Sequence, residues 1–479
     1  MTAFFGIDFG TTNSTAMKLM AGEFHKYGDE AGQPLPSVVA LDRATGEASC
    51  GRDVWRNREE YRTAGAVYVI ESIKLHMGSD LRWPTEVGVW TPEDVAAVVL
   101  KQLSARAKHL GLEGIEEAVI SIPVDYPAES RRALRRAAVK AGIQIKTFIT
   151  ESTAALVRHF GRLQHCRYVA VFDWGGGTLD ISVLEIRDGR VFELSTEGMD
   201  IAGDAIDKDF AQAIHARVME ERREKLPFLS MPSVDQDNLR TKCELAKWQF
   251  SKLPVTDILL SAYGGSPLSI SVQRDWFESL ISPHVDLAIE LLTRAIQKAG
   301  VSFDAINRLL VIGGSSQLRL LHDKLRNDQR FAASFQSSSD AEWDCAAGAA
   351  IIARAPGSHE TAESIGILLS DNSFYELIRE GEVVLSDVRS VSLSLVEDSE
   401  QANLILAKRI NGQRHITSAE SIVEFGVGTA GFDLECIDLR YSIDPDLVLK
   451  VDASSRVLGV REVAREYGKL RFAYHVPPQ

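Results

Sequence analysis

The hydrophobic positions in the first three quarters of the chain form short continuous runs separated by stretches with helical spacing. Apolar runs at 3–7 and 117–124 predict buried strands. Thr91 to Asp94 places a capping residue, a proline and two acids in succession, which predicts a helix start, and Gly111 would end that helix. A second helix, rich in Arg and Ala, is predicted over 128–140. This alternation predicts an α/β architecture.

The pattern changes in the last quarter of the chain. Residues 356–361 are polar and rich in helix and strand breakers, which is typical of a linker. Beyond them, short runs of alternating apolar and polar residues predict strands at 393–396, 405–406 and 437–443. The last run is followed by a turn at Asp444. A smaller, all-β domain is the simplest interpretation of this region.

Composition excludes several classes of protein. The chain has 479 residues, 45% hydrophobic and 25% charged, and a net charge of -14, which argues against a broad nucleic-acid surface. Its five cysteines are far apart and form no C-x-x-C pair, so neither a disulfide framework nor a zinc site is expected. No window approaches the ~20 apolar residues of a membrane span. No basic leader precedes the first strand, and we expect a soluble, cytoplasmic protein without a membrane partner.

One internal repeat changes this picture. Residues 6–14 and 171–180 both read apolar, Asp, aromatic, Gly and then Thr. Each is followed by a strand-like run, at 15–20 and 181–186. We therefore predict two hairpins, each of the form strand, glycine-rich tip, strand.

Glycine-rich tips of this kind suit a polyphosphate. Glycine lets the backbone come close to a phosphate, and the exposed N–H groups and Thr hydroxyls donate to its oxygens. Asp8 and Asp173 are anions, so they would act through Mg²⁺, by holding its water ligands. Either tip alone could be an ordinary hairpin turn. The pair in register favours one polyphosphate clamped from two sides.

Two widespread phosphate motifs do not account for such a site. The P-loop pattern G-x-x-x-x-G-K-[ST] is absent from the sequence. A literal G-x-G-x-x-G occurs at 426–431, but strand-like residues follow it at 432–434 rather than a helix. We interpret it as unrelated to nucleotide binding.

Together with further stretches in the same order, the repeat resembles the DnaK-type heat-shock protein (Hsp70) chaperone family of the actin-like ATPase superfamily. Residues 6–14 and 172–180 are similar to the two phosphate motifs of that family. Residues 118–156 resemble its first connecting segment, and 243–251 and 310–316 resemble its two adenosine-binding segments.

The resemblance covers about 4–353 and continues more faintly over 437–453. It implies an α/β fold for the first part of the chain, in which residues 1–356 form a two-lobed actin-like (ribonuclease H-like) ATPase domain. A linker at 357–363 and a smaller all-β sandwich domain at 364–479 would follow.

The resemblance also implies roles for single residues. Lys74, Glu151, Asp173 and Thr178 would be catalytic, and Asp8, Asp173 and Glu151 would face the metal, mainly through its waters. A lone lysine is more often a surface residue, and only the matched position of Lys74 suggests catalysis. The implied cofactors are ATP or ADP and Mg²⁺, with K⁺ as a further candidate ion. The residues implied to bind the nucleotide are Gly10, Thr11, Thr12, Asn13, Gly175, Gly176, Gly177, Asp180, Gly203, Glu244, Lys247, Trp248, Ser251, Gly313, Gly314, Ser315, Gln317 and Glu342.

Some of these assignments have a simpler alternative, and some positions depart from the family. Glu244, Lys247 and Ser251 share one helix face, which an amphipathic surface helix would also produce. Trp248 and Gln317 stand where the family stacks the base between two arginines, so base affinity or preference should differ.

Other departures concern partners. Residues 147–152 replace the family's usual sequence before the catalytic glutamate, which argues against a standard J-domain co-chaperone. The linker lacks the usual acidic and leucine-rich character. The sequence ends soon after the β-domain, so we expect a peptide site without a helical lid and with fast exchange.

Three functions remain open. The first is a chaperone-like ATPase of slow turnover that binds extended or unfolded peptide on its β-domain. The second is a nucleotide-dependent regulatory scaffold for one dedicated protein partner. The third is another superfamily enzyme, such as a sugar kinase or a filament-forming ATPase, for which no acceptor-site motif is found. We favour the first.

Overall fold

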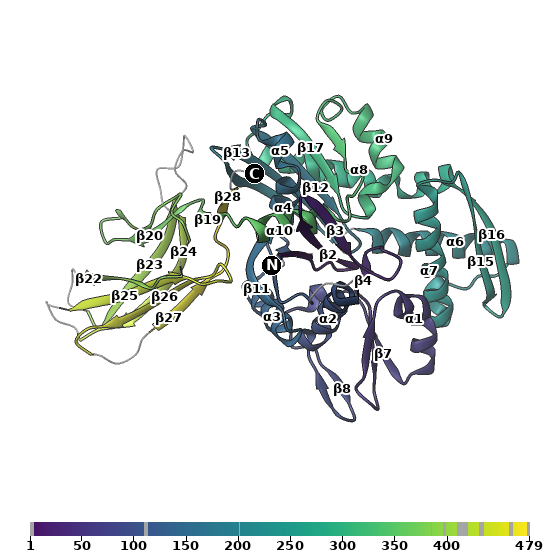
Figure 1. The fold of residues 1–479 in the computed structure, drawn as a ribbon, viewed down its shortest axis with the longest axis horizontal. Helices are drawn as coiled ribbons and strands as arrows, with labels where there is room; N and C mark the ends of the chain where they lie inside the picture. The colour runs from purple at the N-terminus through teal and green to yellow at the C-terminus, as the bar shows by residue number, and fades with distance from the viewer. Residues whose placement is uncertain are drawn as a thin grey trace. The chain divides into compact units, whose positions relative to one another are not determined.

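The computed structural model describes residues 4–109, 114–200, 202–384, 386–395, 399–409, 420–430, 435–458 and 463–476 (Figure 1). Its contacts group into two units. The first comprises Met1–Val124, Ala133–Glu185 and Leu194–Arg354, and the second comprises Asp125–Arg132, Ile186–Glu193 and Ala355–Gln479. The first unit mixes helices and sheets and the second is mainly strands, so the predicted fold class is confirmed.

The first hairpin lies in a sheet of the first unit with the strand order β11-β10-β1-β2-β3. Strand β1 runs parallel to β10 and antiparallel to β2, so Asp8 at the end of β1 lies opposite Thr15 and Ser121. The strands are β1 (Phe5–Asp8), β2 (Asn13–Met20), β3 (Glu23–Tyr27), β10 (Glu117–Ile122) and β11 (Gln144–Thr150), and the short β4 (Leu35–Pro36) pairs with β2.

The second hairpin repeats this arrangement. Strand β12 runs parallel to β17 and antiparallel to β13, which places Asp173 opposite Asp180 and Ile312. The strands are β12 (Tyr168–Trp174), β13 (Leu179–Arg187), β14 (Arg190–Met199), β17 (Ile306–Ile312) and β18 (Phe335–Ser337). The sequence repeat is therefore also a repeat of topology, with an aspartate near the end of the first hairpin strand in both sheets.

Both helices predicted before residue 141 are present. Helix α3 spans Ala128–Lys140, and α2 spans Pro92–His109. At the start of α2 the amide and the hydroxyl of Thr91 donate to Asp94 Oδ2 at 2.9 and 2.6 Å, and the Asp94 amide donates to Thr91 Oγ1 at 3.3 Å. This reciprocal capping explains the start of the helix. Gly111, which we expected to end it, lies outside the described residues.

Small residues let helix α10 (Asp344–Arg354) pack closely on the first sheet and on α4 (Glu151–Arg158). A Cβ on Gly6 would lie 2.1 Å from the amide nitrogen of Ala350, and one on Gly348 would lie 1.8 Å from the carbonyl oxygen of Ala154. Any larger side chain at either position would push the elements apart. The run Ala346 to Ala350 is thus explained by backbone proximity.

The remaining elements of the first unit surround these sheets. Helices α1 and α7 lie side by side (Figure 1). The helices are α1 (Arg52–Ala64), η1 (Ile73–His76), α5 (Phe160–Leu163), α6 (Gly203–Arg222), η2 (Phe228–Ser230), α7 (Ser233–Phe250), α8 (Arg274–Lys298), η3 (Phe303–Ala305), η4 (Ser315–Gln317) and α9 (Arg319–Asn327). The strands are β5 (Val39–Asp42), β6 (Ala48–Cys50), β7 (Val67–Ile70), β8 (Trp83–Thr85), β9 (Gly88–Trp90), β15 (Val255–Tyr263) and β16 (Ser266–Gln273).

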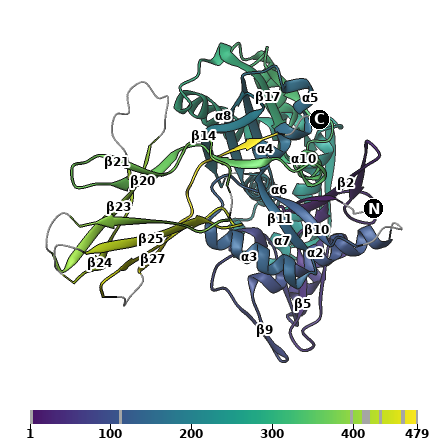
Figure 2. The ribbon, with the colours of Figure 1, turned by 60° about the vertical axis from the view of Figure 1, so that its left-hand side comes forward.

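The second unit contains two four-stranded antiparallel sheets, with orders β21-β20-β23-β24 and β22-β25-β26-β27 (Figure 2). Inward-facing residues such as Ile365, Leu406 and Leu439 form one hydrophobic core. The strands are β20 (Ser364–Leu368), β21 (Phe374–Ile378), β22 (Arg389–Ser394), β23 (Gln401–Arg409), β24 (Glu420–Gly428), β25 (Cys436–Ile443), β26 (Leu449–Ser455) and β27 (Val463–Tyr467).

The strands predicted in this region fall on β22, β23 and β25, although Val396 lies outside the described residues. Of the G-x-G-x-x-G pattern, Gly426 and Gly428 lie within β24. Gly431 and residues 432–434 are likewise outside the described part of the chain.

Residues 358–361, which the sequence suggested as linker, form strand β19 (Ser358–Thr361) of the second unit. This strand pairs antiparallel with β28 (Phe472–His475), and β28 also pairs with residues 190–192. His359 contacts the rings of Phe472 and Tyr474, and Glu360 is 2% exposed and accepts a hydrogen bond from Arg190 Nε at 2.5 Å. Polar residues such as His359 and Glu360 can form part of this sheet because each side chain has an interaction partner there.

Candidate functional site

The two glycine-rich tips meet face to face within the first unit. A Cβ on Gly176 would lie 1.9 Å from Thr12 Oγ1, and one on Gly177 would lie 2.6 Å from Thr11 Cγ2. Only glycine fits at such distances, so the tip of one hairpin is shaped around the tip of the other. The structure thus brings together the two motifs that the sequence repeat paired.

A narrow cavity of about 130 Å³ lies at this meeting point. The predicted residues that line it are Asp8, Gly10, Thr11, Thr12, Asn13, Lys74, Glu151, Asp173, Gly175, Gly176, Gly177, Thr178, Asp180, Glu244, Lys247, Trp248, Gly313, Gly314, Ser315 and Glu342. A second, larger cavity of about 650 Å³ adds Ser251 and Gln317. Gly203 lines neither cavity; its amide supports the second tip by donating to the Gly175 carbonyl at 3.2 Å.

Carboxylates crowd the narrow cavity. Burial raises the pKa of Asp8 to about 6, and the negative charge of Glu151 adds to this, while Lys74 and a hydrogen bond from Ser121 Oγ at 3.0 Å oppose it. Burial, followed by the charges of Glu151, Asp8 and Asp180, also raises the pKa of Asp173 well above its usual range. Such a concentration of negative charge favours the binding of a cation.

One cation of the chain already faces these acids. Lys74 lies in η1, and its Nζ is 2.5 Å from Glu151 Oε1 in the first turn of α4. Both side chains are buried, at 6% and 9% exposure, so Lys74 is not the surface lysine of the alternative interpretation. Thr150 caps α4 by accepting a hydrogen bond from the Thr153 amide at 3.3 Å, which fixes where Glu151 stands.

Hydrogen bonds from η4 and α6 hold the second tip in place. The Gly175 carbonyl accepts a hydrogen bond from Ser315 Oγ at 2.6 Å, and the Gly176 carbonyl accepts one from the Asp204 amide at 2.8 Å. Gly313 has φ +85°, and a Cβ there would lie 2.5 Å from Asp173 Oδ1. The Gly-Gly after β17 is therefore needed for the backbone to pass this aspartate.

Two residues that sequence reasoning assigned to the ribose and base already have protein partners. Lys247 Nζ lies 2.6 Å from Asp207 Oδ2, with both side chains buried, and Arg58 donates to Glu244 Oε2 at 3.1 Å. Burial raises the pKa of Asp207 to about 7, although Lys247 opposes the shift. Sequence reasoning missed Asp207 and Asp204. The sequence feature that could have identified them is a pair of aspartates three residues apart at the start of α6.

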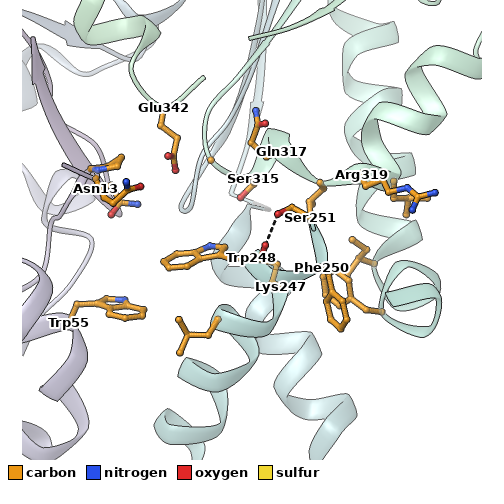
Figure 3. Close-up of a pocket in the computed structure, with 18 of the residues that line it drawn as sticks. Asn13, Trp55, Lys247, Trp248, Phe250, Ser251, Ser315, Gln317, Arg319 and Glu342 are labelled. Carbon is orange, nitrogen blue, oxygen red and sulfur yellow. Dashed lines mark hydrogen bonds between the residues drawn. The ribbon is translucent and has the colours of Figure 1, made fainter. Parts of the chain in front are cut away.

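The larger cavity is lined by aromatic and amide groups (Figure 3). Trp248 is 44% exposed, and Figure 3 shows it between Trp55 and the side of the cavity formed by Gln317 and Glu342. Ser251 Oγ donates to the Trp248 carbonyl at 2.6 Å. Trp55 was also missed; its signal is an indole in an otherwise strongly charged helix.

A comparison with known protein families decides the family. The model of one family, described as Hsp70 protein, matches residues 4–466. The chain belongs to the Hsp70 family. Hsp70 proteins in general bind nucleotide with Mg²⁺, hydrolyse ATP and bind peptides through their C-terminal domain, and the predicted membership is confirmed. Searching the described residues of this Hsp70 chain finds no helix with the length and hydropathy of a membrane span.

The residues present fit a nucleotide with its metal. Within the described ranges, the hydroxyls of Thr12 and Thr15 and Asp207 Oδ1 are buried without a hydrogen-bond partner. No three His, Cys, Asp or Glu side chains of the described part of this Hsp70 chain are placed to ligate a metal directly. Carboxylates such as those of Asp8, Asp173 and Glu151 would hold Mg²⁺ through its water ligands, because Mg²⁺ in proteins usually keeps several of its waters.

Proposed function

We propose that this Hsp70 chain is a Mg²⁺-dependent ATPase that couples slow ATP hydrolysis to the binding of an extended or unfolded peptide. In this proposal residues 1–356 form the ATPase domain and 364–479 bind the peptide. The observation that carries it is the contact between the two tips, where Gly176 lies against Thr12 above a cluster of buried acids. The proposed location is the cytoplasm.

Hydroxyl groups and backbone amides would hold the phosphates. Thr11, Thr12 and Thr178 line the narrow cavity together with the glycine tips, and each hydroxyl can donate to a phosphate oxygen. The unpartnered Thr12 hydroxyl supports this role. Asp8, Asp173 and Glu151 would orient the water ligands of Mg²⁺.

Lys74 and Glu151 would serve the chemical step. Bound Mg²⁺-ATP supplies the phosphoanhydride bond and a cation that offsets the charge of the acids. Lys74 Nζ brings a positive charge into a buried site, where it stabilises negative charge that develops on phosphate oxygens. Glu151 Oε1, held by Lys74, would orient a water molecule and accept its proton.

ATP hydrolysis by the full chain, measured with and without a generic unfolded peptide, tests the proposal. The expected result is Mg²⁺-dependent hydrolysis that the peptide accelerates. Absence of hydrolysis at saturating Mg²⁺-ATP would refute the enzymatic part. The control is the Lys74→Met variant, in which neither condition should support turnover.

A second function, a nucleotide-dependent scaffold for one dedicated protein, is favoured by one observation. Residues 358–361 are a paired strand of the second unit, with Glu360 buried against Arg190, rather than a free segment. A segment fixed in a sheet is a poor switch between nucleotide states. Hydrolysis that is indifferent to unfolded peptide would favour this function. In either case the altered residues 147–152 make a standard J-domain co-chaperone an unexpected partner.

A further inference from the structure

Two tryptophans from separate helices stack beside the larger cavity. Trp55 of α1 and Trp248 of α7 have ring centroids 5.7 Å apart and an interplanar angle of 14°. Trp55 is 8% exposed, whereas Trp248 is 44% exposed. The pair therefore has a buried member and a member with one free face.

The buried member is held by two arginines of its own helix. The guanidinium groups of Arg58 and Arg52 lie over the Trp55 ring, 5.0 and 5.8 Å from its centroid. Arg52 is bound in turn to Asp29 at 2.7 Å, and Arg58 to Glu244 of α7 at 3.1 Å. These ion pairs and cation–π contacts hold Trp55 as a rigid surface against α7.

The other face of Trp248 is turned to the cavity. In Figure 3, Trp248 lies between Trp55 and the side formed by Gln317 and Glu342, and the cavity of about 650 Å³ includes this space. A flat aromatic surface with an apolar body favours stacking of a flat heterocycle. Gln317 and Glu342 line the same cavity, and in Figure 3 the carboxyl group of Glu342 extends toward Trp248.

We propose that Trp248 is a shared stacking surface, with Trp55 on one face and the purine base of the nucleotide on the other. Trp55 is then a positioning residue: it acts on the base only through Trp248. This inference rests on the proposed nucleotide binding. It names the two residues that would determine how tightly the base of the nucleotide is bound.

The stacked pair couples binding of the base to the contact between helices α1 and α7. Trp248 can present a fixed face only while α1 and α7 remain close enough for the indoles to stack. Base binding and the α1–α7 contact therefore stabilise each other, because each favours the same arrangement. The contribution of Trp55 should appear only with ligands that carry a base.

The test compares ligands with and without a base by titration calorimetry on the full chain. The probes are Mg²⁺-ADP and Mg²⁺-tripolyphosphate, and the variants are Trp55→Ala, Trp55→Phe and Trp248→Ala. Trp55→Ala should weaken Mg²⁺-ADP binding about five- to tenfold and leave Mg²⁺-tripolyphosphate within about twofold, in line with the strength of an aromatic pair. Trp55→Phe should restore most of the ADP affinity, and Trp248→Ala should lose at least as much as Trp55→Ala.

Trp90→Ala is the matched control, since Trp90 is an indole of the same unit, in β9, that lines neither cavity. It should bind both probes as the wild type does. Equal weakening of both probes in Trp55→Ala, or an unchanged ADP affinity, would overturn the inference while leaving nucleotide binding intact. If the wild-type chain binds neither probe, the proposed function itself fails, and the inference fails with it.

Discussion

Lys74 Nζ lies 2.5 Å from Glu151 Oε1, and both side chains are buried beside Asp8 and Asp173. Lys74 thus offsets a cluster of acids in which burial and mutual repulsion raise the pKa of both aspartates. The pair joins η1 to α4, two elements far apart in sequence. Loss of this pair should lower both the free energy of unfolding and the rate of ATP hydrolysis. Each effect can be measured on its own.

Lys74→Met is expected to lower the free energy of unfolding by about 3–5 kcal/mol, because it leaves the Glu151 carboxylate buried without its partner. The double variant Lys74→Met/Glu151→Gln should recover part of this loss, since the charge is then absent as well. Thermal or denaturant unfolding measures both. Lys26→Met is the control: Lys26 forms a similarly short ion pair with Asp340, at 2.6 Å, but both side chains are exposed, so less than about 1 kcal/mol should be lost.

The same variants separate binding from turnover. Lys74→Met and Glu151→Gln should still bind Mg²⁺-ADP, because the tips and the aspartates remain. Turnover of ATP should fall at least about a hundredfold, as is typical when one preorganised charged group is removed. Single-turnover hydrolysis measures this. A variant that hydrolyses ATP at nearly the wild-type rate would remove the catalytic role from that residue.

Stability should depend on pH through Asp207, whose pKa burial raises to about 7. The native state therefore holds the proton more tightly than the unfolded chain, whose aspartates have a pKa of about 4. Stability is lost as the pH rises from about 4 through 7. Asp207→Asn lacks this group, so its free energy of unfolding should fall less than that of the wild type between pH 5 and pH 8. The difference between the two proteins should therefore shift in favour of the variant as the pH rises, whichever of them is the more stable.

Asp42→Asn is the control for this pH dependence. Hydrogen bonds led by the Thr45 amide lower the pKa of Asp42, so its carboxylate is ionised in both states above about pH 5. Its denaturation midpoints should follow those of the wild type in parallel over pH 5–8. A parallel course for Asp207→Asn as well would show that Asp207 titrates normally.

Gly176→Ala should abolish the fit between the tips. The new methyl group would lie 1.9 Å from Thr12 Oγ1 and 2.7 Å from its Cβ, so one tip must move. We expect Mg²⁺-ADP affinity to fall more than about tenfold, since a displacement of this size removes well-aligned phosphate donors. Gly428→Ala, where a Cβ meets nothing within 4 Å, should leave affinity unchanged. Unaltered binding by Gly176→Ala would mean that the tips do not enclose the ligand.

The sequence predicted those parts of the fold and site that have a local signal. Asp8 and Asp173 are each followed by glycine, threonine and a second apolar run, and that pattern fixes both hairpins and their tips. The cap of α2 at Thr91 is equally local. Lys74 and Glu151 could be assigned only through the resemblance to a family, because nothing in their immediate sequence indicates that they meet.

Other features depend on contacts that no local pattern records. Trp55 stacks on Trp248, and Lys247 pairs with Asp207, only because α1, α6 and α7 pack together. Residues 358–361 look like a linker by composition but become a strand when β28 supplies a pairing edge. In each case a tertiary partner outweighs the local preference.

The most direct test of the account is the thermal unfolding of the wild-type chain with millimolar ADP in the presence of Mg²⁺ or of EDTA. A ligand that binds only the native state stabilises it by about 2.7 kcal/mol at a hundredfold excess over its Kd. We expect a clear rise in Tm with Mg²⁺-ADP, little rise with ADP and EDTA, and a clearly smaller rise with Mg²⁺-ADP in Gly176→Ala. An unchanged Tm of the wild type with Mg²⁺-ADP would contradict nucleotide binding between Asp8 and Asp173.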